Sequence, residues 1–137
     1  MSLKLQIVRD GEIIFEMPLS PTEWPREELL TQLEDFQDDY HRFSKIYNAL
    51  SNETRLMMMK QIMEKRNRTI NFSDYMRELD LNPKLVWENT QKLRDSGFLV
   101  KVGRGRYRCS EIGETGFMMM SIVLRRIIDA LDEFDNL

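Results

Sequence analysis

Residues 71–110 decide the fold, and they read NFSDYMRELDLNPKLVWENTQKLRDSGFLVKVGRGRYRCS. The first part of this stretch has apolar residues at helical spacing, which predict a short helix with one apolar side: Phe72, Tyr75, Met76 and Leu79. Asp80-Leu81-Asn82 interrupts the spacing and predicts a turn.

A second helix is predicted to begin at Pro83 and to run to about Ser96. Asn82 can cap this helix, because its side-chain oxygen can accept from the free N–H groups of the first turn. Proline suits the first helical position, where the missing N–H would have no partner within the helix. Gly97 ends the helix, because glycine readily adopts the left-handed backbone found just after many helices.

Two short strands are predicted next, over residues 98–102 and 106–110, joined by Gly103-Arg104-Gly105. Strand alternation turns one set of side chains outward, and these are basic: Lys101, Arg106 and Arg108, with Arg104 at the tip. It turns the other set inward: Val100, Val102, Tyr107 and Cys109. A helix, a turn, a second helix and a basic hairpin together predict a winged helix-turn-helix.

Charge is distributed unevenly along the 137 residues. Residues 1–44 carry 4 basic and 10 acidic side chains, residues 45–110 carry 14 and 7, and residues 111–137 carry 2 and 6. The net charges of these segments are therefore −6, +7 and −4, which agree with the total of −3. A basic middle between acidic ends is typical of a module that binds a polyanion.

Several classes of protein are disfavoured by composition. No run of 18 apolar residues predicts a membrane span, and no signal peptide is visible at the N-terminus. One cysteine, Cys109, and one histidine, His41, argue against an intrachain disulfide and a Cys/His metal site, and suit a reducing cytoplasm. No catalytic set or phosphate loop is recognisable, so we expect neither an enzyme nor a bound cofactor.

The N-terminal residues predict a β-hairpin. Residues 3–8 and 13–17 have strand character, and Asp10-Gly11 between them tolerates the positive φ angles of a two-residue turn. Simple alternation places four apolar side chains on one face: Val8, Ile13, Phe15 and Met17. Two strands alone are marginally stable, and the sequence leaves open whether they join the wing, pack on a helix or reach a partner chain.

A long helix is predicted from about Pro25 to residue 50, and another from Thr115 or Ser110 to about Phe134. Both carry apolar residues at alternating spacings of three and four, which is typical of tightly paired helices. Each exceeds what one small domain needs, so we expect a homodimer. The predicted interface comprises Leu29, Leu33, Phe36, Phe117, Met120, Leu124, Ile127 and Leu131.

Between these segments, the chain resembles the ArsR-like winged-helix regulators of bacteria and archaea. The resemblance covers about residues 43–113 and rests on three short stretches: residues 49–56 (ALSNETRL), 93–99 (LRDSGFL) and 107–113 (YRCSEIG). It implies the winged-helix fold, a dimer and DNA-binding repressor activity.

The chain also departs from that family. Metal-sensing relatives carry a cysteine pair on the helix before the turn, whereas residues 72–76 contain no thiol, so we expect no metal site there. When the chain is aligned with the family on Gly97, the groove-facing positions of the second helix are Lys84, Trp87, Glu88 and Gln91. One of these residues is bulky and one is acidic, whereas relatives have small polar and basic residues there. Val86 and Leu93 are expected to point inward.

We therefore predict an α+β, mostly α-helical protein with three parts. These are an N-terminal β-hairpin and connector (1–24), a winged helix-turn-helix with an extended first helix (25–113) and a C-terminal dimerisation helix (114–137). We expect a DNA-binding repressor, with an effector or a protein partner left open. The predicted DNA contacts are Lys84, Trp87, Glu88, Gln91, Lys92, Lys101, Arg104, Arg106 and Arg108. The alternative is a winged-helix protein-interaction module of the transcription machinery.

Overall fold

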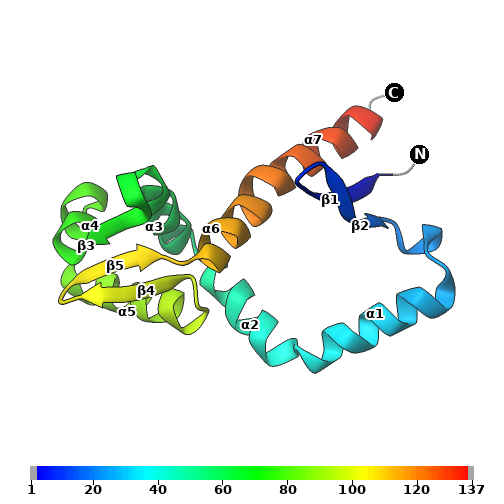
Figure 1. The fold of residues 1–137 in the computed structure, drawn as a ribbon. Coiled ribbons are helices and arrows are strands. Elements are labelled where there is room, and N and C mark those ends of the chain that lie inside the picture. The colour runs from blue at the N-terminus through cyan, green and yellow to red at the C-terminus, as the bar shows by residue number, and fades with distance from the viewer. Residues whose placement is uncertain (1–2, 136–137) are drawn as a thin grey trace. The chain divides into compact units, whose positions relative to one another are not determined.

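The computed structural model describes residues 3–135 and divides into two compact units, Met1–His41 and Arg42–Leu137. Figure 1 shows the elements in chain order. Residues 1–2 and 136–137, which belong to the predicted hairpin and C-terminal segments, lie outside the described residues. The predicted three-part division of the chain stays a prediction.

The first unit begins with the predicted hairpin, formed by β1 (Lys4–Arg9) and β2 (Glu12–Pro18). Asp10 and Gly11 both have positive φ, 50° and 84°, as the two-residue turn requires. The pairing shifts between Ile7 and Val8: Ile7 pairs with Phe15, but Val8 pairs with Ile13. The extra residue in β2 forms a bulge, so the predicted single apolar face is wrong.

A short 3₁₀ turn, η1 (Pro21–Glu23), connects the hairpin to α1 (Arg26–Asp38). The indole N–H of Trp24 donates to the carbonyl of Pro18 at 2.9 Å, and this bond links the start of α1 to the end of β2. The predicted single long helix is wrong, because the backbone leaves helical geometry at Asp39 (φ −106°, ψ 12°) before α2 (Tyr40–Ala49) begins. Two successive aspartates are poor helix formers, and Asp38 opposes the dipole at the end of α1.

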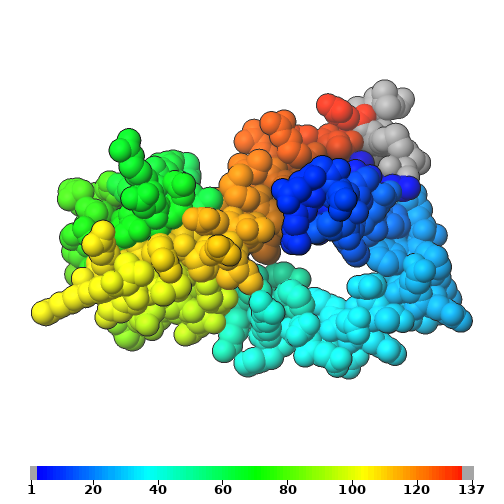
Figure 2. Space-filling model, in the orientation of Figure 1, coloured from blue at the N-terminus to red at the C-terminus, as the bar shows by residue number. Residues whose placement is uncertain are grey.

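The second unit contains the predicted winged helix-turn-helix. Its helices are α2, α3 (Glu53–Glu64), α4 (Phe72–Leu79) and α5 (Pro83–Asp95), and its antiparallel sheet has the order β3-β5-β4. The strands are β3 (Thr69–Asn71), β4 (Leu99–Gly103) and β5 (Arg106–Cys109). Figure 2 shows the yellow hairpin around residues 100–109 projecting from the body of this unit.

Side-chain caps fix the helix starts in this unit. Asn52 accepts from the backbone N–H of Arg55 at 3.2 Å. Asn82 accepts from that of Leu85 at 2.9 Å, as predicted. Gly97 follows α5 with a φ of +84°, also as predicted. The core that these elements enclose contains Ala49, Met58, Met59, Ile62, Ile70, Tyr75, Val86, Leu93, Phe98, Leu99, Tyr107 and Cys109.

Strand β3 was not predicted from the sequence. It follows a 3₁₀ turn, η2 (Arg66–Arg68), in which Asn67 and Arg68 have positive φ. Ile70 of β3 pairs with Tyr107 of β5, and both side chains are buried. The amide of Phe72 donates to the carbonyl of Gly105 at 2.7 Å, so the strand leads directly into a contact with the wing.

The wing corrects the predicted alternation. Leu99 pairs with Cys109 and Lys101 with Tyr107, so these four side chains share the inner face of the sheet. Val100 pairs with Arg108 on the outer face, and Val100 and Val102 are 39% and 45% exposed rather than buried. The prediction is right for Tyr107, Cys109, Arg106 and Arg108, and wrong for Val100, Val102 and Lys101.

The C-terminal helix starts as α6 (Glu111–Met118), continues through a π-helical segment η3 (Met119–Val123) and ends as α7 (Leu124–Asp135). Ser110 caps it, since its hydroxyl accepts from Gly113 N–H at 3.0 Å. In η3, Leu124 N–H reaches the carbonyl of Met119, and the Ser121 hydroxyl donates to that of Phe117. No helix within residues 3–135 is long and apolar enough to cross a membrane.

Candidate nucleic-acid interface

Helix α5 has one buried and one exposed side. Val86, Asn89, Thr90 and Leu93 form the buried side, at the spacing of a single helix face. The opposite side presents a set of outward residues that we call the α5 face: Lys84, Trp87, Glu88 and Gln91. Val86 and Leu93 are fully buried, so the predicted orientation of the helix is confirmed.

The α5 face is nearly neutral. The ammonium nitrogen of Lys84 lies 3.9 Å from a carboxylate oxygen of Glu88, one helical turn away, so the positive and negative charges offset each other. Trp87 is 58% exposed and belongs neither to the core nor to the apolar residues packed against it. Gln91 is half-buried and Lys92 is exposed at the flank of the helix, where a groove also contains Asn52 and Thr54 of the α3 start.

A buried arginine holds α5 against α2 and α3. Arg55 is only 4% exposed. Its guanidinium donates to the carbonyls of Asn48 at 2.7 Å and Ala49 at 3.0 Å, which end α2, and to the side-chain oxygen of Asn89 at 2.9 Å. The amide nitrogen of Asn89 donates in turn to the carbonyl of Leu85 at 2.8 Å. One side chain therefore joins three helices.

The charge of Arg55 is stabilised without an acidic partner. Its hydrogen-bond acceptors in the described part of the chain are neutral oxygens. Burial lowers the pKa of Arg55 below its usual range. The carbonyl end of α2 favours a cation, because the helix dipole is negative there.

Sequence reasoning missed Arg55 as a site residue, although its position gives a signal. The buried residues of α3 are Arg55, Met58, Met59 and Ile62, which recur at helical spacing. Leu56, the first apolar residue of α3, is exposed and does not belong to this stripe. A cation that continues a buried stripe indicates a structural hydrogen-bond network.

The wing places its basic side chains on two sides. Lys101 follows the inner face and lines a groove with Gln91 and Arg94 of α5. Arg106 and Arg108 lie on the outer face of the sheet, where they pair with Asn71 and Thr69 of β3. The structure thus brings Lys101 towards the α5 face and directs Arg106 and Arg108 away from it.

A backbone hydrogen bond to the start of α4 holds the turn at the wing tip. Gly105 has a φ of +61°, which glycine adopts at little cost, and its carbonyl accepts from the Phe72 amide at the start of α4. Arg104 is exposed at the turn between the two strands. A tip held this way presents Arg104 from a defined backbone position, which suits contact with a phosphate or a narrow groove.

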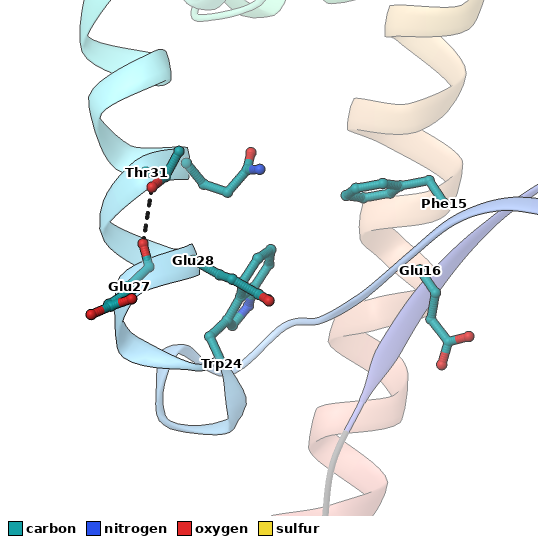
Figure 3. Close-up of a pocket in the computed structure, with 7 residues that line it drawn as sticks. Phe15, Glu16, Trp24, Glu27, Glu28 and Thr31 are labelled. Atoms are coloured by element: carbon teal, nitrogen blue, oxygen red, sulfur yellow. Dashed lines mark hydrogen bonds between the residues drawn. The ribbon is translucent and has the colours of Figure 1, made fainter.

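The first unit offers a different surface. A pocket of about 470 Å³ lies between β2 and α1, lined by Phe15, Glu16, Trp24, Glu27, Glu28, Thr31 and Gln32. Figure 3 shows the Glu28 carboxylate beside Trp24, the Glu27 carboxylate pointing away from it, and the Thr31 hydroxyl donating to the Glu27 carbonyl, a bond of 3.0 Å. Three carboxylates in this lining make the surface unsuitable for a polyanion.

The described residues hold no cluster suited to a metal ion, and their one thiol is buried. Among residues 3–135, no group of three or more His, Cys, Asp or Glu side chains is placed to hold a metal ion. Cys109 is buried, and this burial raises the pKa of its thiol to about 11. The thiol is therefore a packing group at neutral pH.

No protein-family model matches the chain, and no curated protein is significantly similar to it. Among solved structures, the chain is similar to a MarR family transcriptional regulator from Streptomyces coelicolor, at 12% sequence identity and a TM-score of 0.46. The similarity covers 81% of this chain and 93% of that protein.

Proposed function

We propose that this chain is a transcriptional regulator that binds duplex DNA, with α5 in the major groove and the wing against the backbone. The observation that carries the proposal is the two-sided character of α5. Its inner side is fixed by Val86, Leu93 and the Arg55–Asn89 hydrogen bond, and its outer side is free. A rigid helix of 13 residues with an exposed polar side is what major-groove reading needs.

The wing supports this proposal electrostatically. Arg104 at the tip and Lys101 beside the α5 face are exposed, so both cations are available to phosphates. Arg106 and Arg108 extend the positive charge over the outer face of the sheet. Such contacts give affinity that does not depend on sequence.

A homodimer is part of the proposal. Leu33 of α1 and Leu124 and Leu131 of α7 are exposed in the single chain, although they belong to the predicted apolar seams. Exposed leucines repeated along a helix favour burial against another helix. A second copy would cover them and would place two α5 faces on one duplex. Kinship with the ArsR-like regulators and repression of transcription are proposals that rest on the sequence motifs.

The test is fluorescence anisotropy of the full chain with random-sequence duplexes over a range of salt concentrations. Log affinity should fall linearly with log salt. Arg104→Ala should lower that slope by about 0.9 for each phosphate that the wing no longer reaches, or about twice that in a dimer with two wings. Arg125→Ala, which removes an exposed cation from α7, should leave the slope unchanged.

A second candidate function is a protein-interaction module, which the exposure of Trp87 favours. Aromatic residues are enriched in protein–protein interfaces, so an indole on an exposed helix face fits a protein partner as well. If the wild type shows no salt-dependent affinity for any duplex, and Trp87→Ala abolishes binding to a protein partner, the regulator proposal fails and this function replaces it.

A further inference from the structure

Trp87 is the least expected residue of the α5 face. It sits on the fifth position of α5, close to the helix start, where recognition helices contact base edges. It is 58% exposed, and its backbone is held in place by the Thr90 hydroxyl, which donates to the Trp87 carbonyl at 3.0 Å. A large apolar ring in this position favours an apolar group on its ligand.

The major groove has one prominent apolar group. The C5-methyl of thymine projects into it, whereas the other base edges there present mainly hydrogen-bond donors and acceptors. An indole placed at the groove can cover one or more thymine methyl groups. This contact does not require a hydrogen bond from the protein.

The neighbouring side chains complete the chemistry. Gln91 lies one helical turn after Trp87 on the same face, and a glutamine amide can bond simultaneously to N6 and N7 of adenine. Lys84 and Glu88, which could read guanine and cytosine, face each other at 3.9 Å. The opposite charges of this exposed pair partly offset each other, and the two neutral side chains match the two bases of an A·T pair.

We infer that the α5 face reads A·T pairs, with Trp87 against thymine methyl groups and Gln91 on adenine. The inference rests on the proposed function and adds to it the class of sequence recognised. It predicts that the preferred site of each α5 contains A·T pairs whose methyl groups lie in the major groove.

The experiment begins with duplexes selected from a random pool by the 137-residue chain. In the selected site, each thymine is replaced in turn by deoxyuridine, which lacks only the methyl group. At contacted positions the affinity of the wild type should fall about fourfold, the effect of one buried methyl group. Replacing adenine by 7-deazaadenine, which lacks the N7 acceptor, should weaken binding by about five- to tenfold where Gln91 contacts it.

Variants assign each effect to its residue. Trp87→Ala should bind thymine and deoxyuridine duplexes equally and keep its sensitivity to 7-deazaadenine. Gln91→Ala should show the reverse, and Trp87→Phe should keep part of the methyl effect. Leu85→Ala is the matched control, because Leu85 is an exposed apolar residue of the same helix outside the α5 face. It should retain both effects.

The outcomes separate this inference from the proposed function. Salt-dependent binding with no difference between thymine and deoxyuridine at any position overturns the A·T reading and leaves the regulator proposal standing. The A·T reading is also overturned, again without harm to the regulator proposal, if Leu85→Ala abolishes the methyl effect while Trp87→Ala retains it. Absence of duplex binding altogether, with Trp87 needed for a protein partner, overturns both.

Discussion

Replacing Arg55 by leucine should destabilise the protein by roughly 3–5 kcal/mol. The guanidinium makes three hydrogen bonds of 2.7–3.0 Å to Asn48, Ala49 and Asn89. Hydrogen bonds to a charged group contribute about 1.5–3 kcal/mol each. The contributions of bonds that share one guanidinium do not add fully, so the total cost is smaller than their sum. That cost is large compared with a typical total stability of about 5–15 kcal/mol.

Asn89→Ala removes one of these bonds, together with the bond from the Asn89 amide nitrogen to the Leu85 carbonyl. It should cost about 1.5–3 kcal/mol, because Arg55 keeps its two carbonyl partners on α2. The double variant should be less destabilised than the two single variants combined, by about 1–2 kcal/mol, since the shared bond is lost only once. A sum that is fully additive would show that the two side chains do not interact in solution.

Urea unfolding followed by far-ultraviolet circular dichroism measures these costs from the midpoint and slope. Protein concentration must be the same throughout, because dimerisation contributes to apparent stability. Lys60→Leu serves as a control, since Lys60 is an exposed cation on the same helix and should change stability by no more than about 0.5 kcal/mol. A cost below about 1 kcal/mol for Arg55→Leu would refute the assigned role.

Packing, protonation and assembly each give a further testable expectation. Gly113→Ala should destabilise the protein by about 1–3 kcal/mol or more, because the new Cβ would lie 2.4 Å from the Phe98 carbonyl oxygen. Gly116→Ala should cost less, because its Cβ would lie 2.9 Å from the Phe98 ring, which can move. Urea unfolding measures both costs, and equal effects would contradict this reasoning. Burial raises the pKa of Cys109 from 9.0 to about 11, so the stability that its neutral thiol contributes is complete below pH 9 and is lost as the pH rises to about 11. The free energy of unfolding, measured with urea across this range, should therefore decline less steeply in Cys109→Ala than in the wild type. Light scattering should show that the wild type is a dimer. The double variant Leu124→Glu/Ile127→Glu should be monomeric or unfolded, whereas Arg126→Glu should remain a dimer. A well-folded wild-type monomer would exclude the proposed assembly.

The parts of the fold that were predictable depend on local chemistry. Asn52, Asn82 and Ser110 cap their helices, and Asp10-Gly11 forms its turn, because each acts on backbone groups within a few residues. The orientation of α5 was predictable for a similar reason, since Gly97 sets its end and helical spacing sets its faces.

The parts that were not predictable depend on distant partners or on single extra residues. Strand β3 exists because β5 provides hydrogen-bond partners some 37 residues later, as for Ile70 and Tyr107. The pairing of β4 with β5 decides which wing side chains face inward, because it puts Lys101 opposite Tyr107 and Val100 opposite Arg108. Arg55 was missed because its acceptors on α2 are carbonyl oxygens, which any sequence provides.

The π-helical segment η3 sets the phase of the C-terminal helix. Its wider turns accommodate one residue more than an α-helix would, so the apolar stripe of α7 is rotated by roughly a quarter of a turn relative to the stripe that precedes it. If Met119–Val123 became α-helical at the same length, Leu124 and Leu131 would turn towards a different direction, whereas deleting one residue from it would let a continuous α-helix keep their present direction. The π-helical conformation of this five-residue segment therefore determines which side of α7 a partner meets.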